Sequence, residues 1–133
     1  MTNQINNQNV NDKLKDFKIK KYVLYELKKF QFNTDTKGFK YLVEAIVLSI
    51  KEPDILENLN KNLYPKIACK YNQKGYLNIK WSIEKSISYM YTNTNSTVLC
   101  KYFNFVEDKK PGAKLVISTV VNNLEKIQLY IIR

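Results

Sequence analysis

The sequence predicts an all-α domain of about six helices with a helix-turn-helix near its centre. Only three glycines and three prolines occur in 133 residues, too few for a β-sandwich or barrel with many tight turns. Long runs rich in lysine, leucine, isoleucine and glutamate favour helices. The length is enough for one hydrophobic core but not for two, so we expect a single helical domain over residues 10–133.

The chain begins with a polar stretch that leads into a lysine-rich helix. Residues 1–9 are rich in asparagine and glutamine, and we expect a disordered or frayed start. Asn11 or Asp12 then caps a helix that runs to about Gln31. Its lysines would form a solvated basic face, although a helix lying on a membrane surface would look similar. The apolar face of this helix is predicted to contain Leu14, Phe17, Leu24 and Phe30.

Two further helices are predicted before the central motif. After a linker at residues 32–36, a helix from about Phe39 to Ile50 has its apolar residues at helical spacing. Pro53 suits the first turn of a short helix that runs to about Leu63, and the acids beside it suit the positive end of the helix dipole. The residues expected in the core are Phe39, Leu42, Val43, Ile46 and Val47 from the first helix, and Ile55, Leu56 and Leu59 from the second.

Residues 64–91 are predicted to form the helix-turn-helix. Pro65 occupies a position that the start of a helix accepts, and residues 72–75 (NQKG) are typical of a turn. The longer helix that follows, which we call the reader helix, has a buried stripe spaced by three or four residues. In this arrangement the second helix enters the major groove of DNA. The stripe consists of Ile79, Ile83, Ser86, Ile87 and Met90.

The opposite side of the reader helix would face the nucleic acid. With Ile83 directed inward, Asn78, Trp81 and Lys85 are expected to point outward, with Glu84 to one side and Lys80 to the other. Asn78 can pair with adenine, and Trp81 can contact a thymine methyl group. Lysines around the motif suit phosphates. We therefore predict that the base-facing residues are Asn78, Lys80, Trp81 and Lys85, and that the phosphate contacts come from Lys61, Lys66, Lys70 and Lys74.

The C-terminal third is predicted to contain two more helices. Residues 92–97 form a polar loop that caps a short helix, and residues 107–112 form a charged turn. The last helix runs from about Ala113 to Leu124, although its β-branched residues also fit a strand. The apolar tail 125–133 either packs on the core or meets a second subunit, which would give a homodimer through the last helix and tail. The apolar residues of these helices are Val98, Leu99, Tyr102 and Phe103, and then Val116, Ile117, Val120, Val121 and Leu124.

The charge of the chain is strongly positive, with 22 lysines and arginines against 12 acids and a net charge of +10. Such an excess favours a polyanionic partner, either nucleic acid or an anionic membrane surface. The alternative is that the lysines only keep the surface soluble. Arg133 is the sole arginine, and lysine suits phosphates better than bidentate base contacts. We expect double-stranded DNA to be the partner.

Several kinds of chemistry lack the residues that they need. The chain has no histidine, the usual general base and the commonest metal ligand. Three glycines can hardly build a phosphate-binding loop. We therefore expect no enzyme activity, metal site or cofactor, and Cys69 is expected to be a small core residue. Two cysteines fit a reducing cytoplasm, and no stretch approaches the ~18 apolar residues of a membrane span, so we expect a cytoplasmic protein without a membrane partner.

Several blocks of sequence, taken in order, resemble one known family. Between residues 37 and 124 the chain is similar to the C-terminal effector domain of the stage-zero sporulation master regulator, the response regulator that commits endospore-forming bacteria to sporulation. The resemblance implies a winged-helix-like effector domain of six helices, whose third and fourth form the DNA-reading unit. It also implies transcriptional control and head-to-tail dimers on tandem DNA sites. The blocks are KGFKYLVEAI (37–46), EPDILENLNKNL (52–63), LYPKIACKYN (63–72) and WSIEKSI (81–87), with Lys110, Pro111 and Leu124 near the end.

Two differences from this family bear on function. The 36 residues before Lys37 are too few for its phosphoacceptor receiver domain, so we do not expect control by phosphorylation. The family reads DNA with arginines on the reader helix, where this chain has Asn78, Trp81 and Glu84, and it has Lys80 in place of an acidic reader. The turn before this helix is also one residue longer. We therefore expect the fold to be retained and the base readout to be altered or weakened.

Two functions follow from these observations. The first is a sequence-specific DNA-binding transcriptional regulator of the sporulation effector type. The second is a receiver-less interaction module that binds and modulates another regulator without reading DNA. Glu84 would repel a phosphate, and Trp81 belongs to a residue type that is common at protein contacts. The two lysines Lys74 and Lys85 should matter for the first function and much less for the second.

Overall fold

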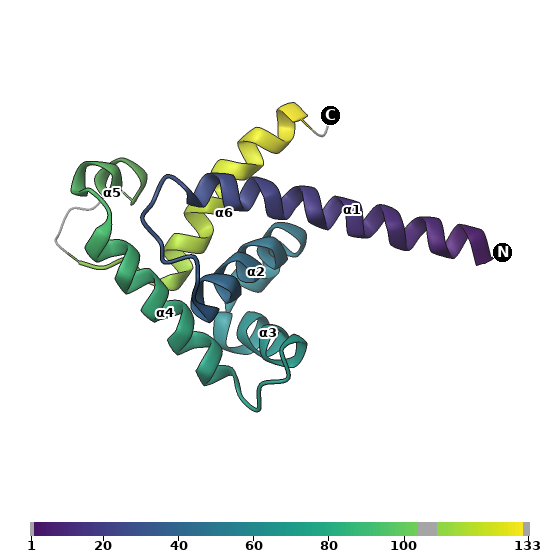
Figure 1. Ribbon diagram of the computed structural model, residues 1–133, viewed down its shortest axis with the longest axis horizontal. Helices are drawn as coiled ribbons and strands as arrows, with labels where there is room; N and C mark the ends of the chain where they lie inside the picture. Colours follow the sequence, from purple (N-terminus) through teal and green to yellow (C-terminus); the bar gives the residue numbers. More distant parts are fainter. Residues whose placement is uncertain (1, 104–108, 132–133) are drawn as a thin grey trace.

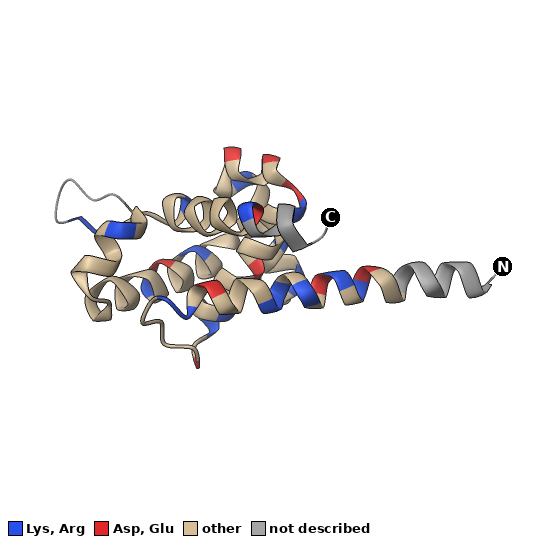
Figure 2. Cartoon of the chain, turned by 90° about the horizontal axis from the view of Figure 1, so that it is seen from above, with Lys and Arg blue, Asp and Glu red and all other residues tan. Residues whose placement is uncertain are grey.

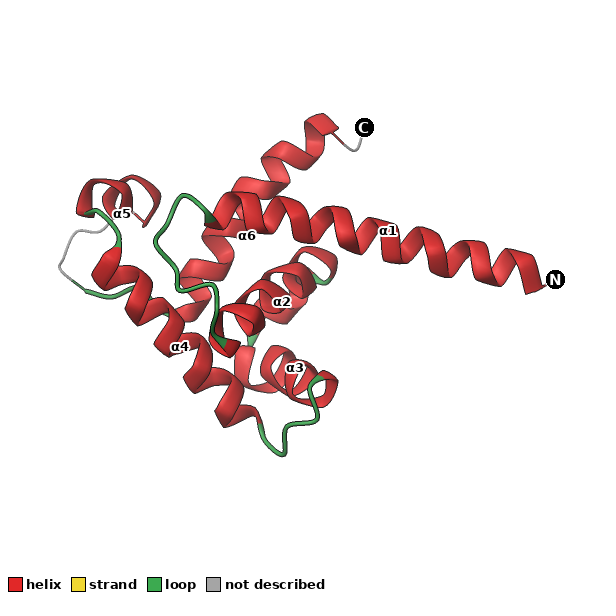
Figure 3. Ribbon diagram, viewed as in Figure 1, coloured by secondary structure: helices red, strands yellow, loops and turns green. Residues whose placement is uncertain are grey.

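The computed structural model describes residues 2–103 and 109–131, and the side chains of residues 10–103 and 109–126. Within these ranges the chain forms six α-helices and no strand (Figure 1, Figure 3). The predicted all-α class is confirmed. The helices are α1 (Thr2–Leu27), α2 (Lys37–Lys51), α3 (Tyr64–Lys70), α4 (Tyr76–Asn93), α5 (Ser96–Phe103) and α6 (Ala113–Ile131).

Helix α2 lies at the centre of the fold and packs against α1, α4 and α6 (Figure 1). Thr36 caps its start, because the Thr36 hydroxyl accepts a hydrogen bond of 3.2 Å from the backbone N–H of Phe39. Leu42, Ala45 and Ile46 are fully buried. The predicted core face of this helix is therefore confirmed, and its bounds differ from the prediction by one or two residues.

Helix α1 differs from the prediction in its bounds. It begins at Thr2 and ends at Leu27, whereas we expected a start near Asn11 and an end near Gln31. The segment at residues 2–9, expected as an irregular start, continues the helix. The division of the chain into a start and a single domain stays a prediction. In Figure 1 the N-terminal part of α1 projects well beyond the other helices.

The predicted apolar face of the first helix is correct only in part, because Phe30 is buried and Leu24 is half-buried as expected, but its first two residues are not. Leu14 and Phe17, expected to face the core, are 53% and 56% exposed. Ile19, Val23 and Leu27 are buried in their place, against α2 and α6. Apolar residues occur on two sides of this helix, and the spacing alone does not tell which side meets the domain.

The segment between α2 and α3 corrects a second prediction. Instead of one helix from Pro53 to Leu63, the chain forms a 3-10 turn at Pro53–Glu57 and a π-helical turn at Leu59–Leu63. Asn58 lies between them with extended backbone, and its side chain accepts a hydrogen bond of 3.1 Å from the backbone N–H of Lys61. Asn58 therefore ends one segment and caps the next.

Helix α6 confirms the helical interpretation of the C-terminal segment and excludes the strand. It runs to Ile131, beyond the predicted end at Leu124. The side chains of residues 127–133 and the predicted turn residues Glu107 and Asp108 lie outside the described residues, so the contact of the tail with a second subunit stays a prediction. The five residues expected to be buried on α6 are all buried: Val116, Ile117, Val120, Val121 and Leu124.

Candidate nucleic-acid interface

The turn between α3 and α4 is fixed by two backbone hydrogen bonds. The N–H of Gln73 donates to the carbonyl of Ala68 at 2.8 Å, and the N–H of Asn72 donates to the carbonyl of Cys69 at 3.3 Å. Asn72 has a positive φ of 55°, which asparagine adopts more readily than most residues. This combination is the Schellman motif, which ends a helix and reverses the chain. The predicted turn therefore forms, and it leads to the start of α4 at Tyr76.

The inner side of α4 is held against α2. Ile79, Ile83 and Met90 are fully buried, and the predicted stripe is confirmed. At the start of α2, a Cβ atom added to Gly38 would lie 2.1 Å from the carbonyl oxygen of Ser82. Only glycine allows the two backbones to approach so closely. The direction in which α4 presents its outer side is therefore set by this contact and by the buried stripe.

The outer side of α4 is open to solvent. Trp81 is 57% exposed, and Asn78 and Lys85 are also exposed. Lys74 is exposed in the turn just before the helix. The structure thus brings Lys74, Asn78, Trp81 and Lys85 to one side of a single helix and its leading turn. Their contact with DNA stays a prediction.

Lys80 lies elsewhere on α4. It precedes Glu84 by one helical turn, and both residues are half-buried. Burial and the negative charge of Glu84 raise the pKa of the Tyr64 hydroxyl to about 12. Because Tyr64 belongs to α3, the Glu84 carboxylate lies toward α3 rather than toward the open side. Lys80 was expected on the other side of the helix from Glu84, but it lies on this same flank, because residues four apart share a face. It is therefore less open to a base edge than Asn78, Trp81 and Lys85.

The four lysines predicted to bind phosphates are all exposed, and two of them form ion pairs. Lys66 donates to Glu52 at 2.7 Å, and Lys70 donates to Glu44 at 2.7 Å. The hydrogen bond to Glu44 raises the pKa of Lys70 above its ordinary value. Exposed ion pairs contribute roughly 0–1 kcal/mol, so a phosphate can replace the carboxylate at little cost. The four residues are Lys61, Lys66, Lys70 and Lys74.

Three residues at this surface were missed in the sequence. Leu77 and Tyr89, which are 43% and 46% exposed, lie four residues before and eight after Trp81 and therefore on its side of the helix. A helical wheel of all apolar residues would have found them. Lys110 comes from the segment before α6, and its ammonium donates to the Ser88 hydroxyl at 2.7 Å. No local pattern predicts this contact, because it joins residues that are distant in sequence.

Cys69 corrects another expectation. We expected a small core residue, but Cys69 is exposed, as is Cys100. Ile67 and Ala68 are buried and supply the inward face of α3. On so short a helix the next position turns away from the core.

The described part of the chain was also searched for other kinds of site. No three of its cysteine, aspartate and glutamate residues are grouped so that they could hold a metal ion. No helix, over the same residues, has the length and apolar character needed to cross a membrane.

Comparison with known families gives one match. The family model described as sporulation initiation factor Spo0A C terminal matches residues 23–124. The match begins within α1 and includes α2, α3, α4, α5 and the buried face of α6. The whole surface around α4 therefore lies inside the matched region.

Proposed function

The chain belongs to the family of Spo0A C-terminal domains, and from this membership we propose that α4 reads duplex DNA in the major groove. The family consists of DNA-binding effector domains of sporulation control, so the chain is a DNA-binding domain of transcription regulation. One observation supports the role of α4 most strongly. Its open side presents Trp81 and Asn78 between Lys74 and Lys85, and no carboxylate lies among them.

The side chains on this surface favour A·T base pairs. Asn78 can form two hydrogen bonds with adenine, and Trp81 and Leu77 can contact thymine methyl groups. No arginine occurs on α4, so the bidentate contact that arginine makes with guanine is missing. Each good base contact contributes roughly 1–3 kcal/mol of discrimination. We infer that the base readout is altered toward A·T pairs and weaker than that of a helix with arginines.

The surrounding lysines would hold the helix in the groove. Lys66 and Lys70 belong to α3, Lys61 lies just before it, and Lys74 lies in the turn after it. Lys110, placed at Ser88, adds a positive charge toward the other end of α4. Contacts with phosphates position a protein on DNA without reading sequence, and they make binding sensitive to salt.

Selection from random duplexes with the full chain tests this reading of sequence. We expect enrichment of A·T-containing sites, and Asn78→Ala should relax the preference at one adenine position. Asn122→Ala is the matched control, since Asn122 is an exposed asparagine on a different helix, α6. Enriched sites without a fixed adenine, or an unchanged preference in Asn78→Ala, would contradict the role of Asn78.

An interaction module without DNA readout is the second candidate function. It is favoured by the apolar residues Leu77, Trp81 and Tyr89, which are exposed together along α4. Trp81→Ala and the double variant Lys74→Ala/Lys85→Ala separate the two functions. Loss of duplex binding in the lysine variant supports DNA reading. A wild-type chain that binds no duplex but binds a regulator through Trp81 would establish the interaction module instead.

A further inference from the structure

Helix α1 has a second apolar side that stays exposed among the residues whose side chains the structure describes. Ile19, Val23 and Leu27 face α2 and α6 and are buried. The residues of the second apolar side are centred about 180° around the helix from these three, at 100° per residue. Val10, Leu14, Phe17 and Tyr25 are among the large apolar residues that remain exposed. We define the outer face of α1 as Val10, Leu14, Phe17, Lys21, Tyr25 and Lys28.

The acidic residues of α1 are turned away from this outer face. Asp16 forms an ion pair with Lys51 of α2, and Glu26 is buried and pairs with Lys29 at 2.9 Å. Asp12 falls on the same side of the helix as Val23. Figure 2 shows basic residues recurring along the described part of α1. Within residues 10–28, the charged side chains that point more than 90° away from Val23 around the helix are all lysines: Lys18, Lys21 and Lys28.

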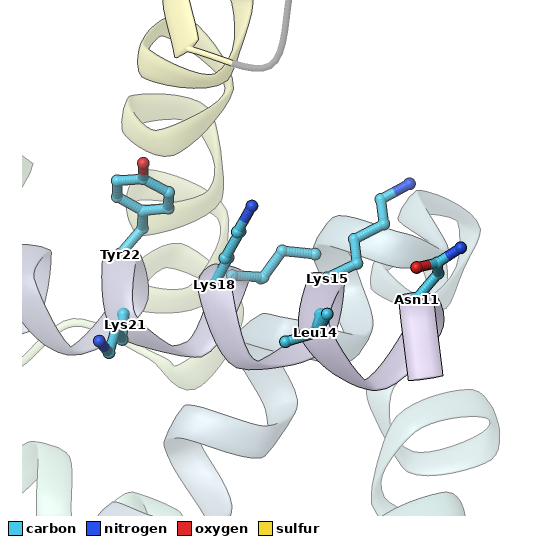
Figure 4. Close-up of a pocket in the computed structure, with 7 residues that line it drawn as sticks. Asn11, Leu14, Lys15, Lys18, Lys21 and Tyr22 are labelled. Atoms are coloured by element: carbon cyan, nitrogen blue, oxygen red, sulfur yellow. The ribbon is translucent and has the colours of Figure 1, made fainter. Parts of the chain in front are cut away.

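The surface beside the outer face is hollowed. An open hollow of about 750 Å³ is lined by α1 residues that include Leu14, Lys18 and Lys21. Figure 4 shows the Lys15 and Lys18 side chains extending on the same side of the helix as Tyr22. The Lys21 ammonium lies 4.8 Å from the centre of the Phe17 ring. Lysine stems and apolar side chains together therefore form a surface that combines apolar area with positive charge.

We propose that the outer face of α1 docks an acidic amphipathic helix of a partner protein. Val10, Leu14 and Phe17 are spaced by four and three residues, the spacing with which two helices pack along a shared seam. Further along the same line, Lys21 and Lys28 would meet carboxylates of the partner. Charge complementarity of this kind selects the partner and speeds association.

Other occupants match the outer face less well. A second copy of the chain would bring Lys21 and Lys28 against lysines of the same surface, and no acid on this side could compensate them. An anionic membrane would place these two ammonium groups at the centre of the contact, facing acyl chains rather than headgroups. An acidic helix satisfies both the apolar part and the charged part of the outer face.

A designed peptide tests the proposal with the full chain. The labelled probe is an amphipathic helix of about three heptads, with leucine along its seam and glutamate at the remaining seam and flanking positions. Binding is followed by fluorescence anisotropy. Leu14→Ser/Phe17→Ser and Lys21→Glu/Lys28→Glu should each weaken binding by at least about tenfold. The matched controls Leu115→Ser and Lys114→Glu change exposed residues of α6 and should bind the probe as the wild type does.

Charge reversal provides the sharpest readout. A second probe with lysine in place of glutamate should bind Lys21→Glu/Lys28→Glu better than it binds the wild type, which mere misfolding cannot produce. The proposal is overturned if the acidic probe does not bind, or if the outer-face variants bind it like the wild type. Binding to phosphatidylserine vesicles that Leu14→Ser/Phe17→Ser abolishes would assign the face to membranes. A dimer lost in the same variant during sedimentation would assign it to a second copy.

The proposal does not depend on the role of α4. The outer face of α1 lies on the side opposite the α2 and α6 contacts and contains none of the residues assigned to DNA. Leu14→Ser/Phe17→Ser should therefore keep the duplex affinity of the wild type. Loss of probe binding with duplex binding retained would place the effect on α1 alone.

Discussion

Tyr64 is the single residue whose protonation is most clearly tied to the fold. It is 2% exposed, and burial, together with the charge of Glu84, raises its pKa from 10.0 to about 12. The folded state therefore keeps the Tyr64 proton more tightly than the unfolded state. The stability that this contributes is fully present below pH 10 and is lost as the pH rises from 10 toward 12.

Tyr64→Phe should remove this dependence on pH. Relative to the variant, the wild type should lose up to roughly 2 kcal/mol of unfolding free energy as the pH rises through this interval. Urea unfolding of both proteins at about pH 9 and at higher pH measures the difference. Tyr89→Phe, at an exposed tyrosine of α4, is the control and should show no such change. A constant difference between the wild type and Tyr64→Phe would contradict the assignment.

The sequence predicted well which residues of α4 are buried. It predicted less well in which direction the other residues of α3 and α4 face. The stripe from Ile79 to Met90 follows from helical spacing, because every member faces a large core. The exposure of Lys80 and Cys69 depends on where the neighbouring helix lies. The spacing of residues within one helix contains no information on that position. The exposure of Leu77 does not follow from the polar residues from which the outer side of α4 was predicted.

At the scale of helices, the contact between α2 and α4 decides how the outer side of α4 is presented. Gly38→Ala would place a methyl group 2.1 Å from the Ser82 carbonyl oxygen, which neither backbone can accommodate without moving. Overpacking of this kind typically costs 1–3 kcal/mol, which we expect to exceed the gain of about 1 kcal/mol from replacing a helical glycine. We expect a lower melting temperature and weaker duplex binding.

Gly112→Ala is the control for this prediction, because nothing lies within 4 Å of the added methyl group. Thermal unfolding followed by circular dichroism and a duplex titration measure both effects. A Gly38→Ala variant that melts at a higher temperature than the wild type would show that the two helices do not depend on this close approach.

Most helices could be predicted from the sequence, but not their exact extents or all of their faces. Pro65 marks a helix start in the residue pattern, and α3 begins next to it. The π-helical turn at Leu59–Leu63 has no pattern of its own, because it results from fitting the chain between α2 and α3. Helix α1 has two apolar sides, and only the packed structure identifies the one that is buried.

For the whole molecule, the excess of lysine is distributed unevenly. Some acidic residues form ion pairs between helices, as in the pairs Glu44–Lys70 and Asp16–Lys51. The outer side of α4 and the outer face of α1 are left with lysines and exposed apolar residues. The net charge of +10 predicted a polyanionic partner, and the family match covers the surface around α4. The second surface could not be predicted, since it depends on the true orientation of α1.

The salt dependence of duplex binding tests the assignment of α4 most directly. The logarithm of the affinity should fall linearly with the logarithm of the salt concentration. The slope of this line should be about −0.9 for each phosphate contact. Lys74→Ala/Lys85→Ala should reduce this slope by about one to two, whereas Lys114→Ala/Lys126→Ala, on exposed positions of α6, should leave it unchanged. Affinity that ignores salt, or a slope equally reduced by both pairs of substitutions, would contradict the placement of DNA against α4.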